Sequence, residues 1–209
     1  MELKDFIEEL SSNSPAPGGG SISALCGSLA NGLGSMVFNL TVGKKMFSNY
    51  EKHIQDTIKE SLEKVSVRKE EFLKLMDKDT EAFMKVMEGF KLPKDTEENK
   101  KIRNEKIQEA YKEAVLVPLE VAEKALDTYE HILIACKYGN KNAITDAGVA
   151  CLLASTSVQG AILNVRINLS SISDEEYREK ISNRCDEIMM ASEKEKDEIM
   201  KIVNGIVQS

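Results

Sequence analysis

Residues 11–43 read SSNSPAPGGGSISALCGSLANGLGSMVFNLTVG and contain no charged side chain. A second charge-free stretch, residues 147–165, reads AGVACLLASTSVQGAILNV. Length alone would let both stretches span a membrane. Their many Ser, Thr and Asn side chains are too polar for hydrocarbon, so we expect no membrane partner. Helices without charge on any face belong inside a bundle, and both stretches therefore predict central helices that other helices surround.

The sequence around these two stretches predicts long amphipathic helices. Gly and Pro are nearly absent from it, and no segment alternates with the period of a strand. Pro93 breaks the pattern once, and Pro118 is expected to kink or split the helix in which it lies. The fold class is therefore all-α, an up-and-down bundle of about five long helices in a single domain, 1–209. Beyond the first charge-free helix, the expected helices cover 2–11, 49–90, 95–138, from 142–146 to 170, and 174–207.

Composition excludes several classes of function. The chain has 28 basic and 35 acidic residues, a formal net charge of −7, which argues against nucleic acid as a partner. Four cysteines without a CxxC pair and only two histidines predict no metal site. The first ten residues carry several charges and no apolar run, so they do not resemble a signal peptide, and we expect a cytoplasmic protein.

Asp79 is the most informative polar residue. It lies on one helical face with residues spaced three or four apart, and it alone among them is charged. The others are Phe72, Met76, Phe83, Val86 or Met87, and Phe90. Burying an unpaired carboxylate costs roughly several kcal/mol, so the group must be paired, protonated or used. Two readings follow: a structural ion pair or helix cap, or a catalytic acid/base.

A second polar stripe runs along the helix after residue 142. It includes Asp146, Asn164 and Asn168. Asp146 could complement the helix dipole or belong to a site. Asn is costly in an apolar helix unless its amide is satisfied, so Asn164 and Asn168 would either read a heterocycle edge or bridge two helices.

The loop SPAPGGGS, residues 14–21, leads into the first charge-free helix. Its glycines Gly18, Gly19 and Gly20 permit close approach, and the free amides of a helix N-terminus, up to Ser21, can bind an anion or a carbonyl oxygen. A structural hinge is the alternative. At the far end of the same helix, Lys44 follows a glycine; it either faces the negative end of the helix dipole or offers a positive charge to an anionic substrate.

Six short motifs follow one another along the chain. They are Pro15-Ala-Pro-Gly-Gly-Gly-Ser21, Asn39-Leu-Thr-Val-Gly-Lys44, Asp79-Thr-Glu-Ala-Phe83, Leu92-Pro-Lys94, Gly139-Asn140 with Thr145-Asp146, and Asn164-Val-Arg-Ile-Asn-Leu169. In this order they resemble the motifs of the formiminotetrahydrofolate cyclodeaminase and methenyltetrahydrofolate cyclohydrolase family. The resemblance covers roughly residues 3–190.

The resemblance implies an all-helical homodimer with a folate-binding cleft and no metal or nucleotide cofactor. The substrate would be a tetrahydrofolate derivative with one or several glutamates. In bifunctional relatives a formiminotransferase domain precedes this domain and supplies the substrate, so a separate formiminotransferase is an expected partner here.

The resemblance also suggests a role for each candidate residue. Asp79 would be the general acid/base, assisted by Asp146. Asn164 and Asn168, like Asp146, would orient the pterin or the leaving nitrogen. Gly18, Gly19, Gly20 and Ser21 would contact a carbonyl oxygen or the aminobenzoyl group. Lys44 would attract the glutamate tail.

Three functional hypotheses follow. The first is conversion of 5-formiminotetrahydrofolate to 5,10-methenyltetrahydrofolate with loss of ammonia. The second is hydrolysis of 5,10-methenyltetrahydrofolate to 10-formyltetrahydrofolate. The third is a non-enzymatic helical interaction protein, in which Asp79 and the two asparagines would be satisfied internally.

Overall fold

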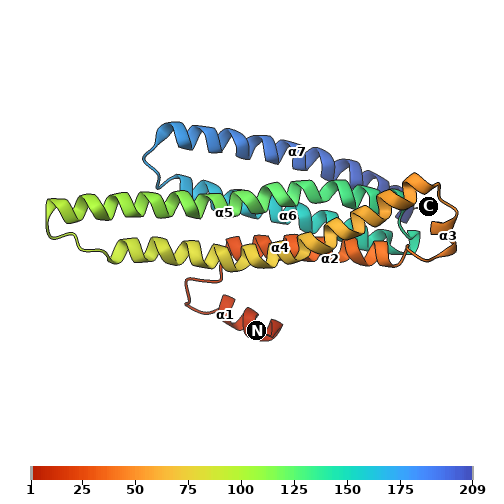
Figure 1. The fold of residues 1–209 in the computed structure, drawn as a ribbon, viewed down its shortest axis with the longest axis horizontal. Coiled ribbons are helices and arrows are strands. Elements are labelled where there is room, and N and C mark those ends of the chain that lie inside the picture. The colour runs from red at the N-terminus through yellow and green to blue at the C-terminus, as the bar shows by residue number, and fades with distance from the viewer. Residues whose placement is uncertain (1, 209) are drawn as a thin grey trace.

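The computed structural model describes residues 2–208, and within them the chain is helical without a strand (Figure 1). Five of the helices are long, which confirms the predicted all-α bundle. The elements are α1 (Leu3–Leu10), α2 (Gly19–Asn39), α3 (Lys45–Ser48), α4 (Lys52–Lys91), α5 (Glu97–Tyr138), the 3-10 turn η1 (Lys141–Ala143), α6 (Ile144–Leu169) and α7 (Glu175–Val207).

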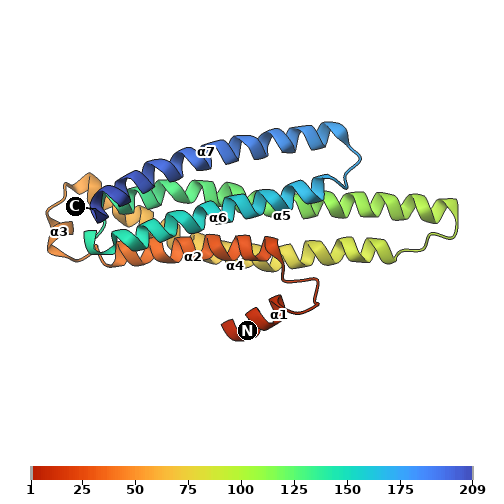
Figure 2. The ribbon, with the colours of Figure 1, turned by 180° about the vertical axis from the view of Figure 1, so that it is seen from behind.

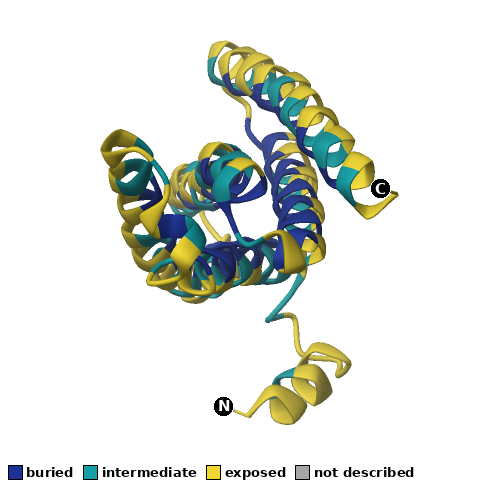
Figure 3. Cartoon of the chain, turned by 90° about the vertical axis from the view of Figure 1, so that its right-hand side faces the viewer, coloured by how far each residue is buried: buried dark blue, intermediate teal, exposed yellow. Residues whose placement is uncertain are grey.

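The two charge-free helices lie side by side, and seen from behind α2 and α6 run along each other in front of α4 and α5 (Figure 2). One side of each stays uncovered, with Leu29 on α2 50% and Leu163 on α6 66% exposed. Contrary to the prediction, other helices therefore do not surround them on every side in the part of the chain that the structure describes. By length and apolar composition both could cross a membrane, but 56% of each apolar window is buried inside the bundle. The long helices turn their buried faces toward one another, and the exposed residues lie outside (Figure 3).

Helix ends follow local chemistry. The side chain of Asp174 accepts a hydrogen bond from the amide of Tyr177, at 3.0 Å, and so caps α7 at the predicted position. Leu92 is extended, and with Pro93 it ends α4.

Of the two alternatives predicted for Pro118, a kink or a split, the split is wrong, because α5 is continuous from Glu97 to Tyr138. A proline inside a helix leaves the carbonyl oxygen four residues earlier without its usual donor. Here the side-chain amide of Asn168 donates to that oxygen, on Ala114, at 2.8 Å. The missing hydrogen bond is therefore replaced from a neighbouring helix.

Small residues bring α2 close to α4. A Cβ on Gly27 would lie 2.4 Å from the ring of Phe72, so only glycine fits there. One residue further along, the hydroxyl of Ser28 donates to the backbone oxygen of Lys69, at 3.0 Å. This close approach fixes the N-terminal half of α2 against the middle of α4. In contrast, α1 contributes no buried residue and stands away from the bundle (Figure 1).

Candidate active site

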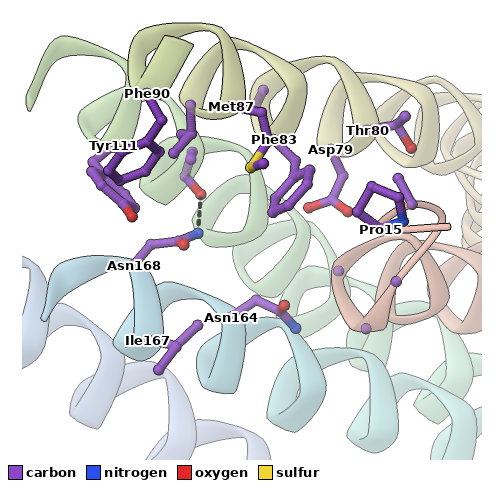
Figure 4. Close-up of a pocket in the computed structure, with 17 residues that line it drawn as sticks. Pro15, Asp79, Thr80, Phe83, Met87, Phe90, Tyr111, Asn164, Ile167 and Asn168 are labelled. Carbon is purple, nitrogen blue, oxygen red and sulfur yellow. Dashed lines mark hydrogen bonds between the residues drawn. The ribbon is translucent and has the colours of Figure 1, made fainter. Parts of the chain in front are cut away.

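A pocket of about 320 Å³ opens where the N-terminal end of α2 meets the second half of α4. The C-terminal end of α6 and the first half of α5 close the other sides (Figure 4). Several of the predicted site residues line it: Gly18, Gly19, Gly20, Asp79, Asn164 and Asn168. The other lining residues are Pro15, Ala16, Thr80, Ala82, Phe83, Val86, Met87, Phe90, Tyr111, Ala114 and Ile167.

Asp79 is half-buried at the wall of this pocket and lies against the first turn of α2. The hydroxyl of Ser21 donates to its Oδ2 at 2.9 Å. In residues 2–208 no Lys, Arg or His nitrogen lies within 4.0 Å of its carboxylate, so it forms no ion pair there. Because the side chain faces a pocket and not a cation, its position fits an acid/base role and does not fit the structural ion-pair reading. Its hydrogen bonds from Ser21, in the first turn of α2, also fit the helix-cap reading.

Two opposing effects set the protonation of Asp79. Burial raises the pKa of its carboxyl above the usual value, because a partly dry environment disfavours the anion. The hydroxyl and the backbone amide of Ser21 stabilise the anion, and they offset part of that rise in pKa. The net shift of the pKa is upward. A raised pKa makes this carboxyl easier to protonate, which favours an acid/base role over that of a fixed anion.

Gly20 allows this arrangement. A Cβ placed on it would lie 2.1 Å from Asp79 Oδ1, so any other residue would push the carboxylate away. The neighbouring Gly19 faces Asn164, whose Nδ2 would lie 3.3 Å from a Cβ. The amides in the first turn of a helix have no acceptor within that helix. The glycines therefore bring the positive end of α2 directly to Asp79 and to the pocket.

The side-chain amides of Asn164 and Asn168 donate to different helices. The Nδ2 of Asn164 donates to the backbone oxygen of Gly160 at 2.8 Å, within α6. The Nδ2 of Asn168 donates to the backbone oxygen of Ala114 at 2.8 Å and so bridges α6 to α5 (Figure 4). Of the two readings made from the sequence, the structure shows helix bridging for Asn168. The side chains of both line the pocket.

An apolar wall continues from Asp79 toward the far end of α4. Phe83, Met87 and Phe90 follow one another along that helix, and the ring of Phe90 meets Tyr111 edge-on at 6.4 Å between centroids (Figure 4). The sequence predicts a core-facing stripe through Phe83 and Phe90, whereas both are over a third exposed and line the pocket. No local pattern singles out Tyr111. A pocket with a carboxylate at one end and a flat apolar wall suits a planar, partly cationic ring system.

Lys44 and Asp146 do not reach this pocket. Helix α2, with its 21 residues, separates Lys44 from the glycine loop by about 30 Å along the axis. Asp146 and Asn164 stand at opposite ends of α6, roughly 27 Å apart along its axis. Lys44 and Asp146 therefore lie at the opposite end of the bundle from Asp79. The expectation that they share one pocket with Asp79 is wrong within a single chain, because a straight helix cannot fold its two ends together.

The part of the chain that the structure describes contains no group of three or more His, Cys, Asp or Glu side chains that could hold a metal ion. The sequence-based expectation of an enzyme without a metal stays a prediction.

Comparisons with known proteins agree with this architecture. The model of the family described as formiminotransferase-cyclodeaminase matches residues 2–187. A methenyltetrahydrofolate cyclohydrolase of Methylorubrum extorquens is 37% identical over 178 residues, which are 85% of this chain and 84% of that protein. The formimidoyltransferase-cyclodeaminase of Mus musculus is 33% identical over 187 residues, 90% of this chain, but the chain spans only 34% of that longer protein.

A solved structure shows the same fold over the whole chain. The crystal structure of a formiminotetrahydrofolate cyclodeaminase from Thermotoga maritima superposes with a TM-score of 0.87 and is 30% identical. It covers 99% of this chain, which in turn covers 98% of it. With its sequence, its fold and its pocket in agreement, the chain belongs to the formiminotransferase-cyclodeaminase family.

Proposed function

We propose that this chain converts 5-formiminotetrahydrofolate into 5,10-methenyltetrahydrofolate and ammonia, in the pocket around Asp79. The observation that carries the proposal is the unpaired carboxylate of Asp79 at one end of an apolar wall, held by Ser21 at the N-terminal end of α2. The names of the relatives in Methylorubrum extorquens and Thermotoga maritima both contain a one-carbon derivative of tetrahydrofolate, which supports the choice of substrate.

The reaction needs proton transfers at one carbon. N10 of the folate attacks the carbon of the protonated formimino group, and a tetrahedral centre with an amino group forms. Asp79 takes the proton that N10 loses and delivers a proton to the amino nitrogen, which leaves as ammonia. The product is a delocalised cation, and the anionic form of Asp79 stabilises it. A carboxyl with a raised pKa suits both tasks, because it changes protonation state within the reaction.

The second candidate is hydrolysis of the methenyl ring. It is favoured by the Methylorubrum extorquens cyclohydrolase, of which the chain covers 84%. Water attacks the same carbon and Asp79 accepts a proton from it. Asp79 then delivers that proton to N5 as the bond from the carbon to N5 breaks, and the remaining hydroxyl loses its proton to solvent, which leaves 10-formyltetrahydrofolate. The same carboxylate at the same carbon therefore serves either reaction.

Absorbance in the near ultraviolet separates these readings, because methenyltetrahydrofolate absorbs there. Formation of that absorbance from 5-formiminotetrahydrofolate, with ammonia released, would establish the deaminase. Loss of absorbance from 5,10-methenyltetrahydrofolate without ammonia would establish the hydrolase. Neither activity, together with no thermal shift on addition of tetrahydrofolate, would show a helical interaction protein instead.

The cellular setting belongs to the same proposal. Neither reaction transfers electrons, so the chain needs no redox cofactor for it. The substrate of the deaminase must come from a formiminotransferase, and relatives such as the mouse protein carry both activities in their name. A cytoplasmic location would give access to both the transferase and the folate pool.

The proposal includes a homodimer. The outer sides of α2 and α6 form one surface, the α2–α6 face, which carries no charged side chain between residues 19 and 39 or between 147 and 165. Large apolar side chains stand exposed on it, from Leu29 and Met36 on α2 to Leu152 and Leu163 on α6. A second copy of the same face would cover them.

A further inference from the structure

The substrate of the proposed function carries negative charge for which the pocket lining has no Lys or Arg. A folate ends in glutamate, so its tail has at least two carboxylates. No Lys or Arg is among the residues that line the pocket. Lys44, which the sequence suggests for this task, lies about 30 Å away along α2. If the pocket takes a folate, a cation that binds the tail has to lie outside the lining residues.

Arg103, on α5, lies at the far end of the apolar wall. The Cζ atom of its guanidinium is 5.5 Å from the centroid of the Phe90 ring, and its Nη2 donates to the backbone oxygen of Phe90 at 3.3 Å. Phe90 itself lines the pocket. Arg103 therefore stands directly behind the last aromatic ring of the wall.

The guanidinium of Arg103 keeps its Nη1 donors for a ligand. Its Nη2 donates to the backbone oxygen of Phe90, and its Nε is buried without an acceptor. Between residues 2 and 208 no carboxylate lies within 4.0 Å of it, whereas Lys100 and Lys106 on the same helix each pair with a glutamate. An Arg fork binds a carboxylate through two parallel hydrogen bonds, so an Arg without a carboxylate is chemically ready for one.

The spacing along α4 matches the length of the substrate. Phe90 follows Asp79 on this helix at a distance of about 16 Å along the axis. That is the reach of an extended aminobenzoyl group followed by one glutamate. With the reacting carbon at Asp79, the benzoyl ring lies along Phe83 and Met87, and the tail emerges beside Phe90. The lysines at positions 91 and 94 follow in the chain and add positive charge at that end.

We propose that Arg103 binds a carboxylate of the glutamate tail and so selects folates over pteroates, which lack glutamate. This inference rests on the proposed function, since it takes a folate to be the ligand of the pocket. It assigns to Arg103 the task that sequence patterns alone suggest for Lys44.

The test compares Arg103→Ala with wild type on two substrates, 5-formiminotetrahydrofolate and the corresponding 5-formiminotetrahydropteroate. Loss of a charged hydrogen bond should raise KM for the folate about tenfold or more. The expected kcat is nearly unchanged, and the pteroate should be turned over equally well by both proteins. Arg103→Lys should recover part of the folate KM because it keeps the charge. Lys101→Ala, which removes an exposed charge two positions away, is the matched control and should change KM for neither substrate.

Two results would overturn the inference. The first is an unchanged ratio of the KM values for folate and pteroate in Arg103→Ala. The second is an equal rise in KM for both substrates, which would make Arg103 a structural support for Phe90. Binding of tetrahydrofolate and tetrahydropteroate, measured by calorimetry, distinguishes failure of the Arg103 inference from failure of the proposed function. If wild type binds folate but turns over no substrate, the proposed function fails while the binding ratio still decides the role of Arg103. If wild type binds neither ligand, both fail.

Discussion

The side-chain amide of Asn168 donates a hydrogen bond of 2.8 Å to the backbone oxygen of Ala114. In a regular helix that oxygen would accept from the amide of residue 118, but Pro118 has no N–H. Helix α6 therefore supplies the donor that α5 lacks. The replacement takes place in the pocket wall, since Ala114 and Asn168 both line it. This is why α5 continues through Pro118 without breaking.

A double-mutant cycle checks this link. Asn168→Ala should lower the free energy of unfolding by about 1–3 kcal/mol, because it leaves a buried carbonyl oxygen without a partner. In the background of Pro118→Ala the same change should cost less, since the new amide of residue 118 can bond to that oxygen. Urea unfolding of the four proteins measures the coupling. Equal costs in both backgrounds would contradict the link.

Asp79→Asn tests the acid/base role. The variant should keep its helices, because Asp79 forms no ion pair within residues 2–208 that the change could break. Its turnover should fall about 100-fold or more, as expected when an acid/base group is lost. Steady-state kinetics and circular dichroism measure the two effects. Asp77→Asn is the matched control, since Asp77 is exposed two positions away. A variant of Asp79 that loses melting temperature but keeps its turnover would assign the carboxylate to structure.

The same substitution should reveal the raised pKa of Asp79 as a dependence of stability on pH. Below about pH 4, the usual pKa of Asp, the carboxyl is protonated in both the folded and the unfolded chain, and its burial carries no ionisation penalty. As the pH rises, the unfolded chain ionises first, because burial raises the pKa of the folded carboxyl. Wild type therefore loses stability as the pH rises through the folded pKa, and Asp79→Asn does not.

The difference in melting temperature, Asp79→Asn minus wild type, should therefore increase as the pH rises from about 4 to about 7. Thermal unfolding of both proteins across that range, followed by circular dichroism, gives the difference. A constant difference would show that the pKa is not raised.

Gly20→Ala should reduce turnover without unfolding the chain. The new Cβ would lie 2.1 Å from Asp79 Oδ1, so the carboxylate must move away from Ser21 and from the substrate. Gly34→Ala, on the same helix, is the control: its Cβ would meet Val65 at 3.7 Å, an ordinary contact, and activity should stay unchanged. The comparison is made by kinetics at matched protein concentration. Full activity of Gly20→Ala would mean that the position of Asp79 tolerates a shift.

The fold could be predicted from the sequence because its signals are local. The charge-free stretches predict α2 and α6, and Asp174 caps α7 where its position predicts. Asp79 could also be found, because one helical face suffices to show a charged residue among apolar ones. The pocket wall could not be predicted in the same way. Which residues of α5 face Phe90 depends on the register between two long antiparallel helices, and no local pattern gives that register.

The wrong predictions about the site have a physical reason as well. Asp146 and Asn164 lie on one helix, and its length already separates them by about 27 Å. A stripe of similar residue types suggests one site, although helical spacing brings residues onto one face and not to one point. Pro118 suggests a break because the partner that replaces its hydrogen bond lies on another helix, at Asn168.

Leu163→Glu tests the homodimer of the α2–α6 face. The side chain of Leu163 is 66% exposed in a face without charge. A carboxylate there would have to be buried unpaired between two copies. The variant should run as a monomer in analytical ultracentrifugation while its helical content stays that of wild type. Met190→Glu is the matched control, because Met190 on α7 is 75% exposed and lies outside this face. It should leave the assembly unchanged. Dissociation by Met190→Glu and none by Leu163→Glu would place the interface on α7 instead, and a monomeric wild type would refute the homodimer altogether.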